Sequence, residues 1–207
     1  MSEEHKREGE IAAVILAAGR SSRMGRAKQV EVVDGVPMVV RAVTTALACG
    51  ADRVWVVTGA HATAVEAVLM PYCQQHLHLR LLHNAEWETG QASSVCCAIE
   101  ALSPQIAAAL FLPVDQPFLP VALLQALIAA WRQGALLAAP VVDGQQRGAP
   151  AIFDRTLFPE LLALAGDVGA RPLLQRHRAA LVTVPAQAMW LRDIDTPADL
   201  AATGSAP

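Results

Sequence analysis

The stretch "IAAVILAAGRSSRMGRAKQ", residues 11–29, is the first part of the sequence that indicates a fold. Its opening run, residues 11–17, is apolar throughout and too short for a surface helix, which is typical of a strand buried on both faces of a parallel sheet. A basic loop follows directly, with Arg20, Arg23, Arg26 and Lys28 close together. The stretch therefore predicts a buried strand that ends in a positively charged loop.

Beyond this loop, apolar runs alternate with segments of helical period almost to the end of the chain. Strands are expected at 53–59, 79–84, 108–115, 135–142, 149–154 and 181–186, and helices at 37–50, 62–73, 93–102, 120–131, near 157–165 and 170–178, and from Thr196 onward. This alternation predicts an α/β fold, a three-layer α/β/α sandwich on a mostly parallel, Rossmann-like sheet. We expect one domain over residues 11–203 and a disordered leader over residues 1–10.

The composition limits the classes of partner. The chain has 207 residues, 54% of them hydrophobic and 17% charged, with a formal net charge of -3. An acidic balance gives no general attraction to nucleic acid or to an anionic membrane. No apolar run is long enough to span a bilayer, and the N-terminus lacks the apolar segment of a secretory signal. We therefore expect a cytoplasmic protein that binds neither nucleic acid nor membrane, in which the basic loop has a local purpose.

The topology predicts where a ligand binds. Right-handed crossovers carry the loops after the strands at 11–17, 79–84 and 108–115 to one edge of the sheet, and open sheets bind ligands at the carboxyl ends of their strands. In the basic loop, small residues expose backbone N–H groups beside several cations, which is what a polyphosphate needs. The spacing matches neither the Walker A loop nor the dinucleotide-binding loop. The alternative is a solvated basic loop without a ligand.

Two acidic motifs are candidate metal ligands. Asp115 ends the strand at 108–115, and a carboxylate there suits Mg²⁺, which prefers oxygen ligands and keeps several waters. Asp193 and Asp195 alternate on an extended segment and so face the same way. The alternatives are an ordinary turn at Asp115, and capping of the last helix by Asp195 with a structural role for Asp193.

A loop rich in glycine and serine is a candidate for reading a base. In "NAEWETGQASSV", residues 84–95, Gly90 and Ser94 can offer backbone groups and a hydroxyl to a base edge. The alternative is that a serine simply caps the helix at 93–102. Another loop, "DGQQRGAP" at 143–150, follows a strand and carries Arg147, so it can also face the site.

Taken in order, these motifs resemble the nucleotidyltransferase family that includes the molybdenum cofactor cytidylyltransferases. The resemblance runs from about residue 11 to residue 202. It rests on L-A-A-G-x-S-x-R-M-G-x-x-K at 16–28, D-x-P at 115–117 and N-x-x-W-x-x-G-x-x-S-S at 84–94, with the later blocks "GQQRGAPAIF", "GDVGARPLL" and "DIDTPADL". Two departures are Glu31, where the family usually continues apolar, and Gln116, where many cytidylyltransferases have methionine.

The resemblance implies a fold of the nucleotide-diphospho-sugar transferase type and a role for each matching residue. Arg23 and Lys28 would bind the triphosphate, and Asp115 would hold Mg²⁺ with Asp195 as a second ligand, so that Arg23, Lys28 and Asp115 are the catalytic residues. The remaining implied ligand-binding residues are Leu16, Ala17, Ala18 and Gly19 for the nucleotide, and Gly90 and Ser94 for the base. Arg147 and residues 166–171 lie in later loops away from these motifs, so we expect them to serve the acceptor; the alternative for Arg147 is a solvated turn.

The reaction that the resemblance implies is transfer of CMP from CTP to the terminal phosphate of molybdopterin, with release of pyrophosphate. Related guanylyltransferases have L-A-G-G where this chain has L-A-A-G, so the methyl group of Ala18 is expected to favour CTP over GTP. GTP as donor and another phosphorylated acceptor remain alternatives. Two other classes also remain: a glycosyltransferase that holds its metal through Asp193 and Asp195, and a protein that binds the mature cofactor and delivers it to a molybdoenzyme.

Overall fold

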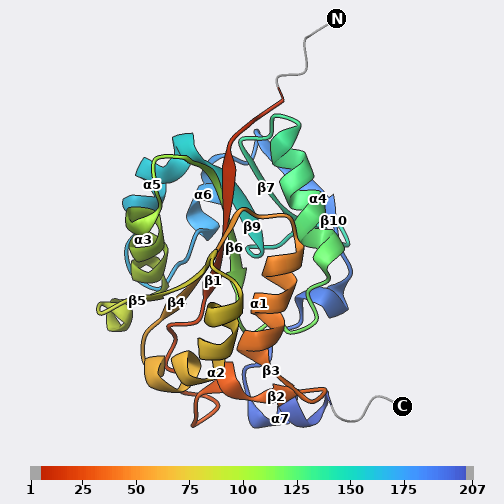
Figure 1. Ribbon diagram of the computed structural model, residues 1–207. Helices are drawn as coiled ribbons and strands as arrows, with labels where there is room; N and C mark the ends of the chain where they lie inside the picture. Colours follow the sequence, from red (N-terminus) through yellow and green to blue (C-terminus); the bar gives the residue numbers. More distant parts are fainter. Residues whose placement is uncertain (1–5, 204–207) are drawn as a thin grey trace, which may run out of the picture.

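The centre of the molecule is an eight-stranded sheet, seen in Figure 1 in the computed structural model, which describes residues 6–203. Its strand order is β10-β7-β9-β6-β1-β4-β5, and β8 pairs with β7. The strands are β1 (Glu10–Leu16), β4 (Arg53–Thr58), β5 (Leu79–His83), β6 (Ile106–Pro113), β7 (Leu137–Val142), β8 (Gln145–Gln146), β9 (Ala151–Asp154) and β10 (Leu181–Pro185). Each strand expected from the sequence is present, and the mostly parallel sheet is confirmed.

Two strands depart from the parallel pattern. β9 runs antiparallel to both β6 and β7, and the short β8 runs antiparallel to β7. Between β7 and β9 the chain makes a tight hairpin with β8, and Asp143 and Gly144 in its turn have φ of 49° and 75°. Two consecutive residues with positive φ are typical of a hairpin turn that matches the twist of its strands. A connection this short cannot cross over the sheet, so β8 runs antiparallel to β7. We expected only a loop at these residues.

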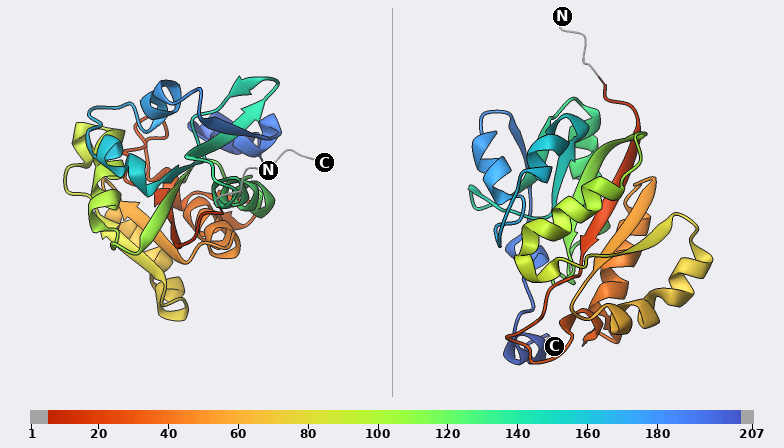
Figure 2. Two further views of the ribbon diagram at one scale, coloured as in Figure 1. Left: turned by 90° about the horizontal axis from the view of Figure 1, so that it is seen from above. Right: turned by 90° about the vertical axis from the view of Figure 1, so that its left-hand side faces the viewer.

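Helices cover both faces of the sheet (Figure 2), which confirms the three layers. The helices are α1 (Met38–Ala48), α2 (Ala62–Gln75), α3 (Gln91–Ala101), α4 (Val121–Arg132), α5 (Phe158–Leu162), α6 (Arg171–Arg176) and α7 (Pro197–Ala201). Buried residues of α1, α2 and α4 form one core with the sheet, and those of α3, α5 and α6 form the other. Alternate residues of β1 enter the two cores, Ile15 the first and Val14 the second, so β1 is buried on both faces as its composition predicts.

The described residues begin before the first strand of the expected domain. Of the leader expected over residues 1–10, residues 1–5 lie outside the described residues. The backbone N–H of Arg7 donates to the carbonyl oxygen of Arg132 at 2.9 Å, and its guanidinium group forms an ion pair with Asp154. Across residues 6–203, no helix has the length and apolar character needed to cross a membrane.

Asp154 is a buried carboxylate that accepts several hydrogen bonds. It accepts hydrogen bonds from the backbone N–H of Thr156 at 3.0 Å, the hydroxyl of Thr156 at 2.7 Å and the indole Nε1 of Trp131 at 2.9 Å. Burial alone would raise the pKa of Asp154, but these hydrogen bonds and the charge of Arg7 outweigh it and lower the pKa below its usual value. The ionised carboxylate therefore stabilises the folded state.

Asp154→Asn should lower the free energy of unfolding at pH 7 by about 1–3 kcal/mol, because an amide cannot accept from all of these donors. A lowered pKa in the folded protein means that the stabilisation is present above the unfolded pKa, near 3.9, and is lost as the pH falls through the folded value. Urea unfolding of the wild type and of Asp154→Asn should be measured at several pH values. The difference between their free energies of unfolding should become smaller below about pH 4. The control Asp34→Asn, at an exposed ion pair, should change the free energy of unfolding little. A difference between the wild type and Asp154→Asn that stays constant at all pH values would contradict the prediction.

Candidate active site

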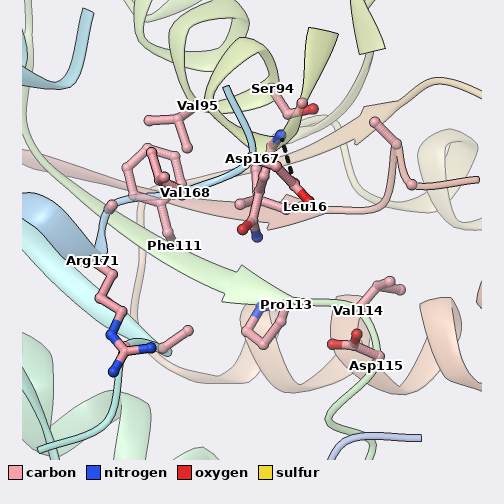
Figure 3. Close-up of a pocket in the computed structure, with 18 of the residues that line it drawn as sticks. Leu16, Ser94, Val95, Phe111, Pro113, Val114, Asp115, Asp167, Val168 and Arg171 are labelled. Atoms are coloured by element: carbon pink, nitrogen blue, oxygen red, sulfur yellow. Dashed lines mark hydrogen bonds between the residues drawn. The ribbon is translucent and has the colours of Figure 1, made fainter. Parts of the chain in front are cut away.

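A cavity of about 1250 Å³ lies at the carboxyl ends of the central strands. The loops after β1, β5 and β6 all line it, which confirms that the topology brings them to one edge. Residues of the β8–β9 loop, of 167–175 and of 191–195 complete the wall, and Asp167, Val168 and Arg171 are labelled in Figure 3. Of the expected site residues, the cavity wall contains Leu16, Ala18, Gly19, Arg23, Lys28, Gly90, Ser94, Asp115, Arg147 and Asp195.

Ala17 is the exception among the expected site residues. Its backbone N–H donates to the carbonyl oxygen of Val57 at 2.9 Å, and its carbonyl oxygen accepts from Nε2 of Gln29 at 3.0 Å. The N–H group thus continues the pairing between β1 and β4, and the carbonyl oxygen holds the Gln29 side chain. Ala17 is not among the residues that line the cavity, and contact between its backbone and the nucleotide stays a prediction.

Gln29 fixes the basic loop and was missed from the sequence. Its side chain is fully buried, and Nε2 donates to the carbonyl oxygens of Ala17 and Gly19, the latter at 2.7 Å. Its Oε1 accepts from the hydroxyl of Ser21 at 3.2 Å. One buried amide thus joins the start of the loop to its end. No periodicity or spacing in the sequence marks this residue, because its partners are backbone groups.

The cations of the basic loop divide into two groups. Arg20, Arg23 and Lys28 line the cavity. Arg26 instead forms an ion pair with Glu31 at 2.7 Å. This pair accounts for the unusual glutamate at position 31, which gives the outward-facing arginine a partner.

Lys28 joins the two expected metal ligands. Its Nζ donates to Oδ2 of Asp115 at 2.6 Å and to Oδ1 of Asp195 at 2.8 Å. Arg23 pairs with the other oxygen of Asp195 at 3.0 Å. Burial alone would lower the pKa of Lys28, but the charges and hydrogen bonds of the two carboxylates outweigh it and raise the pKa, so the ammonium group is charged. The structure therefore brings together all four residues that we expected at the triphosphate and the metal.

The acidic segment before α7 is held in place by an apolar residue. Ile194 is fully buried with Met24, Val33 and Met38, between the basic loop and the β2–β3 hairpin (Val32–Val33, Val36–Pro37). Its neighbours Asp193 and Asp195 both line the cavity, as their alternation predicts. The capping alternative for Asp195 is wrong. The hydroxyl of Thr196 accepts from the backbone N–H of Asp199 in a capping box, and this leaves the carboxylate of Asp195 free to face Lys28.

Asp193 and Gln116 form a second polar pair beside this cluster. Nε2 of Gln116 donates to Oδ1 of Asp193 at 3.0 Å, and burial raises the pKa of Asp193. The amide oxygen of Gln116 is buried and has no hydrogen-bond partner among the described residues. The glutamine that departs from the family pattern thus contacts the acidic segment and leaves a spare oxygen acceptor near Asp115.

The donor set fits a magnesium ion. One oxygen of Asp115 and one of Asp195 lie within hydrogen-bond distance of a single point, the Nζ atom of Lys28. Within residues 6–203, no group of three or more histidine, cysteine or acidic side chains is placed to hold a metal. At a nucleotide, Mg²⁺ usually has one or two carboxylates as ligands, and waters and phosphate oxygens are its other ligands.

The start of α3 differs from the sequence prediction. The helix begins at Gln91, so Ser93 and Ser94 lie inside its first turn, and the expectation of a serine cap is wrong. Nδ2 of Asn84 donates to both serine hydroxyls, at 2.8 Å and 3.0 Å. Asn84, which the sequence analysis left without a role, therefore positions the Ser94 hydroxyl at the cavity wall.

The missing cap comes from a distant segment. The carbonyl oxygen of Gly166 accepts from the backbone N–H of Ala92 at 3.0 Å, and Oδ1 of Asp167 accepts from that of Gln91 at 3.3 Å (Figure 3). A Cβ atom at Gly90, where φ is 115°, would lie 2.5 Å from the carbonyl carbon of Gly166. Only glycine permits this contact, which holds residues 167–171 in the wall beside Gly90.

Ala18 and Arg147 lie at different parts of the wall. The methyl group of Ala18 packs next to Gly59, where an added Cβ atom would lie 2.8 Å from it. Arg147 is exposed in the loop before β9, and Arg171 begins α6. Arg171 and Asp115 are well separated in Figure 3. The cavity wall therefore has a cation away from the cluster of Arg23, Lys28, Asp115 and Asp195, as well as the two cations within that cluster.

Comparison with known proteins agrees with this geometry. The MobA-like NTP transferase domain matches residues 13–181. The purine catabolism protein PucB of Bacillus subtilis is 33% identical over 194 residues, which cover 89% of this chain and 91% of PucB. The bifunctional protein GlmU of Anaeromyxobacter sp. is 31% identical over 186 residues, 87% of this chain but 38% of GlmU.

Solved structures agree as well. Rv0371c of Mycobacterium tuberculosis superposes with a TM-score of 0.81 at 26% identity, over 94% of this chain and 97% of that protein. A complex of Rv0371c with manganese gives 0.76 at 22% identity, over 95% and 98% of the two chains. The matching domain covers most of the sequence and contains the basic loop, Asp115 and most of the cavity wall, while Asp193 and Asp195 follow it in the chain. This chain is a nucleotidyltransferase of the MobA-like NTP transferase family.

Proposed function

We propose that the protein transfers CMP from CTP to the terminal phosphate of molybdopterin and releases pyrophosphate. The observation that carries the proposal is the cluster of Lys28, Arg23, Asp115 and Asp195 in one cavity, with two cations and two carboxylates at its wall. A triphosphate needs the cations, and a divalent metal bound to that triphosphate needs the carboxylates. The resemblance in sequence and the family membership support the choice of molybdopterin as the acceptor.

The residues of the chain would act by binding and alignment. Lys28 and Arg23 would neutralise the triphosphate as charge moves toward the leaving pyrophosphate, and Gly19 would offer its backbone N–H group. A phosphate oxygen of the acceptor is already anionic, so its attack on the α-phosphorus requires no general base. Mg²⁺ held by Asp115 and Asp195 would supply further charge neutralisation at the phosphates. Catalysis then rests on alignment and electrostatic stabilisation.

The nucleotide would lie between the basic loop and the start of α3. Leu16 and Ala18 line the cavity at the end of β1, and Gly90 and Ser94 line it at the start of α3. Because the methyl group of Ala18 packs next to Gly59, selection of the base by this methyl group stays a prediction. CTP is the proposed donor. The alternatives are GTP, another phosphorylated acceptor, and delivery of the finished cofactor to a molybdoenzyme.

A pyrophosphate-release assay with the four nucleoside triphosphates, with and without molybdopterin, tests the proposal. We expect release only with molybdopterin present, and CTP preferred over GTP by roughly 10-fold or more in kcat/KM. Turnover in the absence of any second protein would exclude a purely delivering role. Release of a nucleoside diphosphate from a sugar nucleotide, offered in a parallel assay, would instead indicate a glycosyltransferase, and no pyrophosphate with any of the four nucleotides would contradict the proposal.

Arg147→Ala should raise KM for the acceptor by about 10-fold or more and leave KM for CTP unchanged, because a charge-assisted contact to an anionic group contributes about 1.5–3 kcal/mol. The reason is its place at the cavity wall in the β8–β9 loop, on a different segment from Arg23 and Lys28. Steady-state kinetics with each substrate varied in turn would measure both constants. Arg80→Ala, at an exposed arginine on β5, is the control. A rise in KM for CTP alone would show that Arg147 serves the nucleotide instead.

A further inference from the structure

The ammonium group of Lys28 lies where a metal between Asp115 and Asp195 would lie. It contacts one oxygen of each carboxylate, at 2.6 Å and 2.8 Å, and only 13% of its side chain is exposed. The two carboxylates come from the end of β6 and from the segment before α7, so the tertiary structure holds them together on either side of the lysine. A single cation therefore contacts both carboxylates at a largely shielded position.

We propose that Lys28 is a placeholder cation: in the nucleotide-free protein it occupies the position that a divalent metal takes in the loaded protein. Metal and triphosphate then bind together, and metal alone binds weakly. The inference rests on the proposed function in one respect, that the substrate brings a triphosphate to the basic loop. The inference adds that Lys28 leaves the carboxylates of Asp115 and Asp195 and contacts the phosphates each time metal and nucleotide bind.

Metal alone is opposed by the charge that it would leave behind. To bind both carboxylates, a divalent cation must break both ion pairs of Lys28. The ammonium group would then remain at a shielded place without an anion and beside a second cation. Removing one partner from a buried ion pair is strongly unfavourable because the remaining charge is uncompensated. Repulsion between the ammonium group and the metal adds to this.

A triphosphate removes the obstacle by giving Lys28 a new partner. The lysine ammonium is a compact charge on a flexible four-carbon stem, so it can turn from the carboxylates to a phosphate without movement of the backbone. Arg23, whose side chain is 70% exposed, can leave the outer oxygen of Asp195 in the same way. By linkage, the triphosphate then raises the affinity for metal by the same factor as the metal raises the affinity for triphosphate.

Binding of Mn²⁺ to the full chain, followed by the electron paramagnetic resonance signal of free Mn²⁺, tests the proposal directly. Without nucleotide, Lys28→Met should bind Mn²⁺ about 10-fold more tightly than the wild type, within the usual range of coupling between sites. The non-hydrolysable analogue α,β-methylene CTP should raise the Mn²⁺ affinity of the wild type by roughly 5- to 150-fold, and that of Lys28→Met by a smaller factor.

Arg23→Met is the matched control, because it removes a positive charge from the same Asp195 but not from between the two carboxylates. Its Mn²⁺ affinity without nucleotide should stay near that of the wild type. Lys28→Gln, as a second variant that also removes the charge, should behave like Lys28→Met. The double variant Asp115→Asn/Lys28→Met should lose the gained affinity, which places the metal at the carboxylates.

Two results would overturn the proposal. One is a nucleotide-free Mn²⁺ affinity of Lys28→Met and Lys28→Gln no higher than that of the wild type. The other is an equal gain in Arg23→Met, which would reflect general charge and not position. The measurement without nucleotide uses neither CTP nor molybdopterin, so a failure of the proposed function would show in the pyrophosphate assay and leave this comparison valid.

Discussion

Asp115→Asn is expected to reduce kcat by roughly 100-fold or more, comparable with the loss of one preorganised electrostatic group, while the fold stays intact. The amide has the shape of the carboxylate but lacks the charge that holds a divalent metal. Lys28 keeps Asp195 as a partner in this variant, so no unpaired ammonium group is left in the cavity wall. Pyrophosphate release at saturating Mg²⁺ measures the loss, and thermal unfolding checks the fold.

Asp143→Asn is the matched control for this substitution. It makes the same chemical change in the turn of the β7–β8 hairpin, where φ is 49° and asparagine is well tolerated. We expect wild-type activity from it. If Asp115→Asn also turned over at a near-normal rate with saturating Mg²⁺, Asp115 would not be a ligand of the metal.

Lys28→Ala and Arg23→Ala should each lower kcat/KM for CTP by about 2–4 kcal/mol of transition-state stabilisation, or roughly 30- to 1000-fold. Both cations would meet a triphosphate whose charge shifts toward pyrophosphate in the transition state. The lysine is the more shielded of the two and faces both carboxylates, so its removal should have the larger effect. Steady-state kinetics with CTP varied would give both values.

Arg26→Ala serves as the control within the same loop. Arg26 is paired with Glu31 and is not among the residues that line the cavity, so its loss should change kcat/KM for CTP little. If Arg23→Ala and Lys28→Ala also kept the wild-type value, the basic loop would be only a solvated surface.

The local pattern of the sequence was sufficient for the elements of the fold and for the region of the site. A uniformly apolar run such as residues 11–17 can be satisfied only between two covered faces, and this alone predicts β1 in the middle of a sheet. Parallel strands with right-handed crossovers then have to bring the loop at Lys28 and the turn at Asp115 to the same edge. The structure confirms both, and it also confirms that Asp193 and Asp195 face one way.

Contacts between distant segments were not predictable in this way. The sequence suggested a serine cap for α3, but Gly166 and Asp167 supply the cap from a segment about 75 residues later in the chain. Nor did it indicate that the backbone N–H of Ala17 pairs with β4. Gln29 carried no signal at all.

The physical reason is the range of each interaction. Hydrophobic period, turn chemistry and strand length act within about one element, so the sequence by itself determined the strands, the helices and the edge of the sheet at which they converge. A hydrogen bond or an ion pair depends on which side chains the folded chain brings within about 3 Å of each other. Only the tertiary structure decided that Lys28 would lie between Asp115 and Asp195, 87 and 167 residues further along the chain.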